Sequence, residues 1–292
     1  GGRAGVVGAP RRQGVGGFPM VREPDSGVAV VVPYLPGHGD RSYDVTSYDL
    51  DLDYRVSSNR LDARATLVVT LRRPTARLAL DLVGLKVGKV TVDGRRPARF
   101  AVRDGRLRID LAAEARPGQQ LTLAVRYGGR PAPLAGVWGD VGWEELSDGV
   151  IVAGQPGGAP TWFPCNDRPD NKATYRIRIT ADSAYTALAN GRLMDRRIGA
   201  GRTTWLYRQA EPTATYLATL QIGRYDVRRL SSSPVPQLLL APTALQTGAA
   251  SDLDRQPAMI RVFNDLFGRY PFEDYLVVVT QDELEIPLEA QG

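Results

Sequence analysis

The stretch Tyr48-Asp-Leu-Asp-Leu-Asp-Tyr-Arg-Val56 alternates apolar and charged residues. Because successive side chains of a strand point to opposite faces, this period of two predicts a β-strand with one apolar and one charged face. The polar group Ser57-Ser-Asn-Arg60 then turns the chain, and the same alternation resumes over 61–71. The two runs therefore predict an antiparallel hairpin.

Further runs of the same period follow this hairpin and indicate more antiparallel strands. They are 78–82, 90–92, 100–102, 107–111 and 121–127, and, after a stretch rich in Gly, Pro and Trp at 128–148, 175–179, 185–189, 205–207, 216–222 and 237–240. Asp93-Gly94 and Asp104-Gly105 stand between runs, where tight hairpin turns favour residues that accept a positive φ. This part of the chain is predicted to be one all-β region of packed antiparallel sheets.

The period changes after Pro242. Residues 242–250 have the composition of a linker, and apolar residues between Met259 and Phe267 then recur at the spacing of one amphipathic helix that ends at Gly268. A short strand-like run follows at Tyr275–Thr280. The predicted fold is mainly β: an antiparallel multi-sheet domain, followed by the first helix and strand of an incomplete α/β domain.

The chain is expected to divide into three regions. Residues 1–32 contain Gly-Gly repeats without an apolar period and are predicted to be a flexible lead segment. Residues 33–242 form the all-β domain, and 243–292 form the linker and the start of the next domain. Since the chain begins with Gly1 and ends at Gly292, we expect it to be a piece of a longer product.

The rarity of soft ligands restricts the chemistry. A single His and a single Cys among 292 residues are too few for a catalytic zinc site built from these residues. They also exclude a His-based catalytic triad unless His38 takes part in it. The net charge is +5, but the basic residues are scattered among acidic ones, so nucleic-acid binding is not expected.

The composition also restricts the cellular location of the protein. No apolar run approaches the length of a membrane-spanning helix. Cys165 is alone, so an intrachain disulfide is impossible and the redox compartment stays undetermined. We expect a soluble protein, and the cytoplasm is favoured slightly over a secreted location, which is not excluded.

Three segments are unusual for ordinary strands and turns. They are Gln155-Pro-Gly-Gly-Ala-Pro-Thr-Trp-Phe-Pro-Cys-Asn-Asp-Arg-Pro169, Gly268-Arg-Tyr-Pro-Phe-Glu-Asp-Tyr275 and Glu285-Ile-Pro-Leu-Glu-Ala-Gln-Gly292. In this order and at these distances they resemble the M1 family of zinc aminopeptidases, the gluzincins that include aminopeptidase N and leukotriene A4 hydrolase. The resemblance covers about residues 40–292. It implies an M1 N-terminal domain followed by the start of a thermolysin-like catalytic domain.

The resemblance also implies a function. The third segment occupies the place of the family's Gly-Ala-Met-Glu-Asn motif, so Glu289 would bind the free α-amine of a peptide substrate and Gln155 would assist it. Ala290 replaces the terminal Asn of that motif, which removes one polar side chain. The family's His-Glu-x-x-His helix would lie beyond Gly292, in a C-terminal catalytic domain that this chain lacks. Zinc is therefore expected in the intact parent enzyme, with no metal ligand and no catalytic residue in this chain.

Other interpretations remain open at this point. The same scaffold suits a non-catalytic β-sandwich module that binds a partner, and the change at Ala290 favours that alternative. Carbohydrate binding through Trp138, Trp143 and Trp162 is disfavoured, because these residues form no repeated platform. We predict that the tryptophans and Phe163 fill cores or support loops, that Cys165 is a buried structural side chain, that His38 is exposed, and that Asp167 pairs with Arg168.

Overall fold

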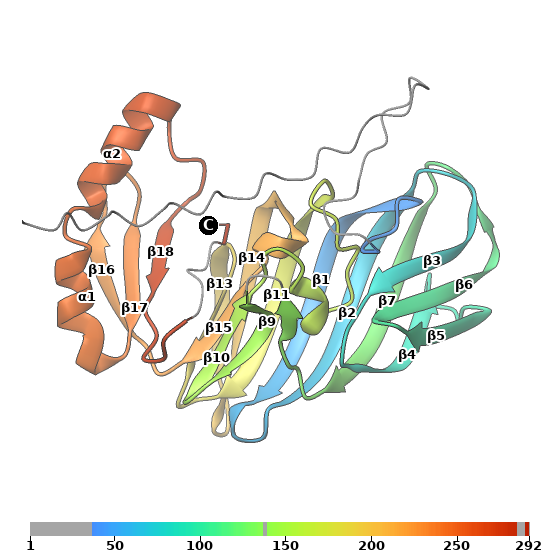
Figure 1. The fold of residues 1–292 in the computed structure, drawn as a ribbon, viewed down its shortest axis with the longest axis horizontal. Coiled ribbons are helices and arrows are strands. Elements are labelled where there is room, and N and C mark those ends of the chain that lie inside the picture. The colour runs from blue at the N-terminus through green and yellow to red at the C-terminus, as the bar shows by residue number, and fades with distance from the viewer. Residues whose placement is uncertain (1–36, 137–138, 285–289, 292) are drawn as a thin grey trace, which may run out of the picture. The chain divides into compact units, whose positions relative to one another are not determined.

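Seven strands form the largest sheet of the computed structural model, which describes residues 37–136, 139–284 and 290–291 (Figure 1). Their spatial order is β13 (Arg192–Ile198), β14 (Arg202–Ala214), β11 (Lys172–Asp182), β1 (Tyr43–Arg55), β2 (Arg60–Leu71), β7 (Gln120–Gly129) and β4 (Lys86–Val92). The predicted hairpin is confirmed: β1 and β2 pair antiparallel, joined by the 3-10 turn η1 (Val56–Ser58). The expectations for residues 1–32, Trp138 and Glu289 lie outside the described residues.

One pairing in this sheet departs from a purely antiparallel arrangement. Strands β1 and β11 run parallel, with Leu50 opposite Ile177 and Leu52 opposite Ile179. Parallel neighbours need a long crossover connection, and here more than a hundred residues separate the two strands in the sequence. Local alternation predicts each strand but contains no information about such a distant partner.

Two smaller sheets share a core with the large one. The first has the order β12 (Thr186–Ala189), β15 (Leu220–Gly223), β10 (Gly149–Ala153), β9 (Gly139–Leu146) and β8 (Leu134–Gly136). The second has the order β3 (Thr75–Asp81), β6 (Arg106–Ala115) and β5 (Arg99–Arg103). Buried residues of all three sheets, such as Leu50, Leu107 and Trp143, belong to one hydrophobic cluster. The predicted strands therefore divide between sheets that pack through their apolar faces, as expected for packed sheets.

The hairpin turns have the predicted chemistry. Asp93 and Gly94 have φ values of 49° and 76°, and Asp104 and Gly105 have 52° and 70°. Two successive left-handed residues are typical of the tight turns that match the twist of paired strands.

The C-terminal part adds one sheet and two helices. The sheet has the order β16 (Asp226–Ser231), β17 (Gln237–Ala241) and β18 (Tyr275–Val278), and β17 and β18 pair in parallel across the domain boundary expected at residue 242. The helices are α1 (Gln246–Asp252) and α2 (Gln256–Phe267), and α2 ends before Gly268 as predicted.

The segment that composition suggested as a linker is helical. Residues 243–252 form the 3-10 turn η4 (Thr243–Leu245) and helix α1. Gln246 Nε2 donates a hydrogen bond of 3.1 Å to the Ala241 carbonyl and one of 2.5 Å to the Asp226 carbonyl, which ties α1 to β17 and β16. The small residues of this segment suggested a linker by composition, but Ala249 and Ala250 favour a helix, and Gln246 anchors its first turn.

Candidate substrate-binding site

Gln155 lies at the end of β10, with its side chain exposed to solvent. The preceding residue, Gly154, packs closely against the backbone of Tyr216. A Cβ at position 154 would lie 2.4 Å from the Tyr216 carbonyl oxygen. Only glycine fits this approach. The Gln155–Pro156 peptide bond is cis, and the Gly158 amide donates to the Gly154 carbonyl, which closes the turn after Gln155.

The remainder of this segment is structural, as expected. The 3-10 turn η2 (Ala159–Thr161) leads into Trp162 and Phe163, which are buried and pack edge to face at 4.4 Å between ring centroids. Cys165 is fully buried, and burial raises the pKa of its thiol well above the usual value. A thiol that is both inaccessible and protonated is a poor nucleophile. The prediction of a structural cysteine is therefore confirmed.

The contacts of Asp167 correct two expectations. Its carboxylate accepts a hydrogen bond of 2.8 Å from His38 Nδ1 and one of 2.7 Å from Thr215 Oγ1. His38 is half-buried rather than exposed, and Arg168 pairs with Asp170 and Asp44 instead of Asp167. Sequence proximity suggested the Asp167–Arg168 pair, but the fold brings partners from distant segments to both residues.

The short segment 215–219 contacts both Asp167, through Thr215, and Gln291, through Leu217. It comprises the 3-10 turn η3 (Thr215–Leu217) and the two residues that lead into β15. The Leu217 carbonyl accepts hydrogen bonds from Asn190 Nδ2 at 2.9 Å and from the Gln291 amide at 3.4 Å. Thr219 Oγ1 donates to the Val152 carbonyl at 2.9 Å, two residues before Gly154. This segment therefore contacts both the strand that leads to Gln155 and the residue two positions after Glu289.

Sequence reasoning missed most of this arrangement. Asn190-Gly191 has the composition of an ordinary turn, and neither Thr219 nor Gln291 stands out in the sequence. Gln291 Nε2 donates to Thr213 Oγ1 at 2.7 Å. Both the side chain and the backbone of Gln291 therefore form hydrogen bonds with the β domain. Glu289 itself lies outside the described residues, and its proximity to Gln155 stays a prediction.

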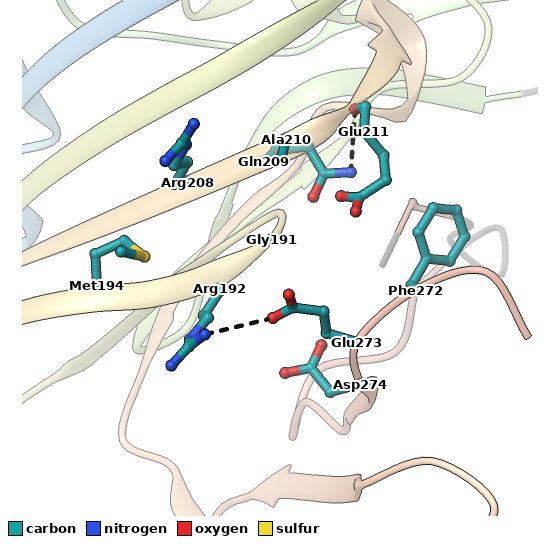
Figure 2. A pocket seen from close by; sticks show the side chains of 10 residues that line it. All are labelled: Gly191, Arg192, Met194, Arg208, Gln209, Ala210, Glu211, Phe272, Glu273 and Asp274. Carbon is teal, nitrogen blue, oxygen red and sulfur yellow. Dashed lines mark hydrogen bonds and ion pairs between the residues drawn. The ribbon is translucent and has the colours of Figure 1, made fainter.

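A cavity of about 260 Å³ lies between strands β13 and β14 and the segment 272–274 (Figure 2). Gly191, Arg192 and the segment 208–211 of β14 form one wall, and Phe272, Glu273 and Asp274 form the other. Arg192 and Glu273 approach to 4.0 Å across it. Burial and the neighbouring charge of Glu273 raise the pKa of Asp274. Three residues of the second unusual sequence segment, Phe272, Glu273 and Asp274, therefore line this cavity.

The described residues do not fit a resident zinc ion. Across 37–136, 139–284 and 290–291, no group of three His, Cys, Asp or Glu side chains converges as metal ligands would. His38 directs Nδ1 to Asp167, and Cys165 is buried and protonated. Zinc needs three protein ligands in a typical catalytic site.

Residues 45–217 match the family model of the peptidase M1 N-terminal domain. The chain belongs to the M1 peptidase family. The matched residues include the Gln155 turn, Asp167, Asn190 and the 3-10 turn η3. The resemblance noted from the sequence is thus confirmed.

Relatives and solved structures agree with this assignment. The leucyl aminopeptidase of Saccharolobus solfataricus is 22% identical over 213 residues, which cover 71% of this chain and 26% of that protein. Aminopeptidase M1-D of Oryza sativa subsp. japonica is 25% identical over 186 residues, or 61% of this chain and 21% of that protein. An M1 zinc metallopeptidase mutant of Deinococcus radiodurans, solved with a Tyr-Ser-Ala substrate, has a TM-score of 0.76 and 28% identity, covering 84% of this chain and 58% of its own. This M1 chain thus spans about a quarter or less of the two aminopeptidases.

Among the residues that the structure describes, no helix is long and apolar enough to span a membrane.

Proposed function

We propose that this chain is the N-terminal portion of a zinc-dependent aminopeptidase and that it recognises the free N-terminus of a peptide substrate. The observation that supports this most strongly is the convergence on segment 215–219. Strand β10, which leads to Gln155, and Gln291, which follows Glu289 by two residues, both bind this segment. Family membership and this geometry together support Gln155 and Glu289 as parts of one site.

The proposed chemistry is the binding of an ammonium group. A carboxylate that accepts a hydrogen bond from a cation forms a stronger bond than two neutral partners do. The exposed amide of Gln155 can accept a further hydrogen bond through its oxygen. A site of this kind selects peptides with an unblocked N-terminus, and it therefore favours exopeptidase over endopeptidase cleavage.

We place the zinc ion and the catalytic residues in the remaining part of the longer parent protein. One His and one Cys in 292 residues cannot supply the ligands, and the described residues form no ligand cluster. The same part of the parent is a partner for helix α2. Five large apolar side chains of this helix are at least half exposed: Met259, Val262, Phe263, Leu266 and Phe267. Such a contiguous apolar face is typical of a surface that another element covers.

The test uses the parent enzyme and free-amine peptide substrates. Replacing Glu289 with Gln keeps the shape and removes the charge. A lost charge-assisted hydrogen bond of about 1.5–3 kcal/mol corresponds to a decrease in kcat/KM of roughly 10- to 150-fold. Gln155→Ala should cause a smaller decrease, because a neutral amide contributes less.

The matched control is Glu283→Gln, which removes an exposed carboxylate six positions earlier. We expect this variant to retain the activity of the wild type. N-acetylated substrates should be poor for every variant, because they lack the ammonium group. If Glu289→Gln stays within a factor of about two of Glu283→Gln, another residue binds the substrate N-terminus.

A further inference from the structure

The side chain of Asn190 is buried and uses its hydrogen-bonding groups almost completely. It is 4% exposed. Nδ2 donates to the Leu217 carbonyl at 2.9 Å and to the Gln291 carbonyl at 2.7 Å, and Oδ1 accepts from the Thr219 amide at 2.7 Å. An asparagine amide has two donors, and both reach backbone carbonyls here. These carbonyls belong to residues that are far apart in the sequence.

Two of these bonds fix segment 215–219 on both sides of Ala218. Leu217 and Thr219 are held by the same amide group, so the path of the chain between η3 and β15 depends on it. The carbonyls of Tyr216 and Ala218 cover Gly154, immediately before Gln155. Asn190 therefore supports the surface against which the Gln155 turn packs.

The third bond reaches the C-terminal end of the described chain. The Gln291 carbonyl accepts from Asn190, and the Gln291 amide donates to the Leu217 carbonyl, which Asn190 also binds. These contacts form a small closed network of backbone groups around one side chain. Loss of that side chain leaves the buried Thr219 amide and the partly buried Gln291 carbonyl without this partner, which is costly.

We propose that Asn190 is a positioning residue for recognition of the substrate N-terminus. It holds Gln291, which follows Glu289 by two positions in the sequence, against segment 215–219, which packs on Gly154 immediately before Gln155. Asn190 does not touch the substrate. This inference rests on the proposed function, and its test is arranged so that the two can fail separately.

The first arm measures hydrogen–deuterium exchange of the C-terminal peptide in the 292-residue chain. Asn190→Ala removes two donors to backbone carbonyls, so exchange at Gln291 should become about tenfold faster. The matched control is Asn171→Ala. Asn171 is also buried, and it also bonds backbone groups through both ends of its amide, but its partners are the amide and carbonyl of Val45. The control should lose comparable stability without faster exchange at Gln291.

The second arm measures kinetics in the parent enzyme. Asn190→Ala should lower kcat/KM for free-amine peptides by about tenfold, mainly through KM, because it weakens ground-state positioning of the ammonium site. Since Asn190 acts through the segment that carries Glu289, the loss should shrink to within about twofold in a Glu289→Gln background. If Asn190→Ala fails to fold, Gln291→Ala is the second variant, because it removes the hydrogen bond to Thr213 without a change in the core. It should also lower kcat/KM, by a smaller factor, and the decrease should again shrink in the Glu289→Gln background.

Three results overturn the proposal. Equal exchange at Gln291 in Asn190→Ala and Asn171→Ala means that Asn190 only stabilises the fold. An undiminished kinetic loss in the Glu289→Gln background means that Asn190 acts elsewhere. If Glu289→Gln alone has no kinetic effect, the proposed function fails and the positioning role fails with it, while the exchange contrast still decides whether Asn190 holds Gln291.

Discussion

At the residue scale, a few polar side chains buried at the ends of strands organise the region around the candidate site. Asp167 joins His38 to Thr215, and Asn190 joins segment 215–219 to Gln291. Asp81 accepts hydrogen bonds from the amides of Gly39 and Asp167. Buried polar groups are tolerated because each has partners, and their arrangement favours one geometry of the chain.

His38 makes the stability of this region depend on pH. Its hydrogen bond to Asp167 is the main cause that raises the pKa of the imidazole above 6.5; the charge of Asp81 also raises it, whereas burial and Arg106 lower it. A raised pKa in the folded state means that protonated His38 stabilises the fold below pH 6.5. This stabilisation is lost as the pH rises through the folded-state pKa.

The variant His38→Gln should therefore lower the free energy of unfolding more at pH 5.5 than at pH 8.5, by about 1 kcal/mol. Denaturant titrations of both proteins at the two pH values measure this difference. His38 is the only histidine of the chain, so no other imidazole complicates the comparison. An equal decrease in unfolding free energy at both pH values would show that protonated His38 is not stabilised by Asp167.

Residue contacts of this kind were the least predictable part of the site. The sequence identifies Gln155 as a polar residue in a Pro-Gly loop, and the exposed side chain agrees with that. Asp167 bonds residues 48 and 129 positions away in the sequence, and one partner of Asn190 is 101 positions away. Periodicity describes neighbours within a strand and says nothing of which distant carbonyl a buried amide will meet.

At the element scale, alternation predicted the strands well because half-buried strands need one apolar face. The hairpin of β1 and β2 and the Asp-Gly turns followed from local chemistry. The parallel pair of β1 and β11, the separate sheet of β3, β5 and β6, and the helical segment 243–252 did not. The two sheet arrangements depend on long-range pairing, which local alternation does not encode. In segment 243–252 the helix propensity of the alanines was outweighed by a composition typical of a linker.

Helix α2 offers a direct test of which face packs within this chain. Ile260 is 5% exposed, whereas Leu266 is 68% exposed. Replacing a buried isoleucine with Ala should cost about 2–5 kcal/mol of unfolding free energy if α2 unfolds together with the sheets. Leu266→Ala should change it by less than about 0.5 kcal/mol in the isolated chain.

Thermal and denaturant unfolding of both variants measures these changes. A large loss for Leu266→Ala would show that the outer face of α2 is already covered, for example by a second copy of the chain. If Ile260→Ala has no effect on global unfolding, α2 unfolds separately from the sheets.

At the scale of the whole molecule, we propose that this chain recognises the substrate N-terminus and that the zinc site lies in another part of the parent enzyme. We predict that the purified 292-residue chain retains no stoichiometric zinc after dialysis and does not hydrolyse an aminoacyl reporter substrate. Elemental analysis and a fluorogenic assay check both expectations. One tightly held zinc ion per chain would mean that carboxylates and His38 form a site that the described residues do not show.

The central claim is that Gln155 and Glu289 together bind the substrate ammonium group. The most direct measurement is a crystal structure of the parent enzyme with a non-hydrolysable dipeptide analogue that has a free N-terminus. The account predicts the ammonium nitrogen within about 3 Å of a Glu289 carboxylate oxygen and of the Gln155 amide oxygen. An analogue bound in the active site with its ammonium held by other residues, and with Glu289 directed away from it, would contradict the account.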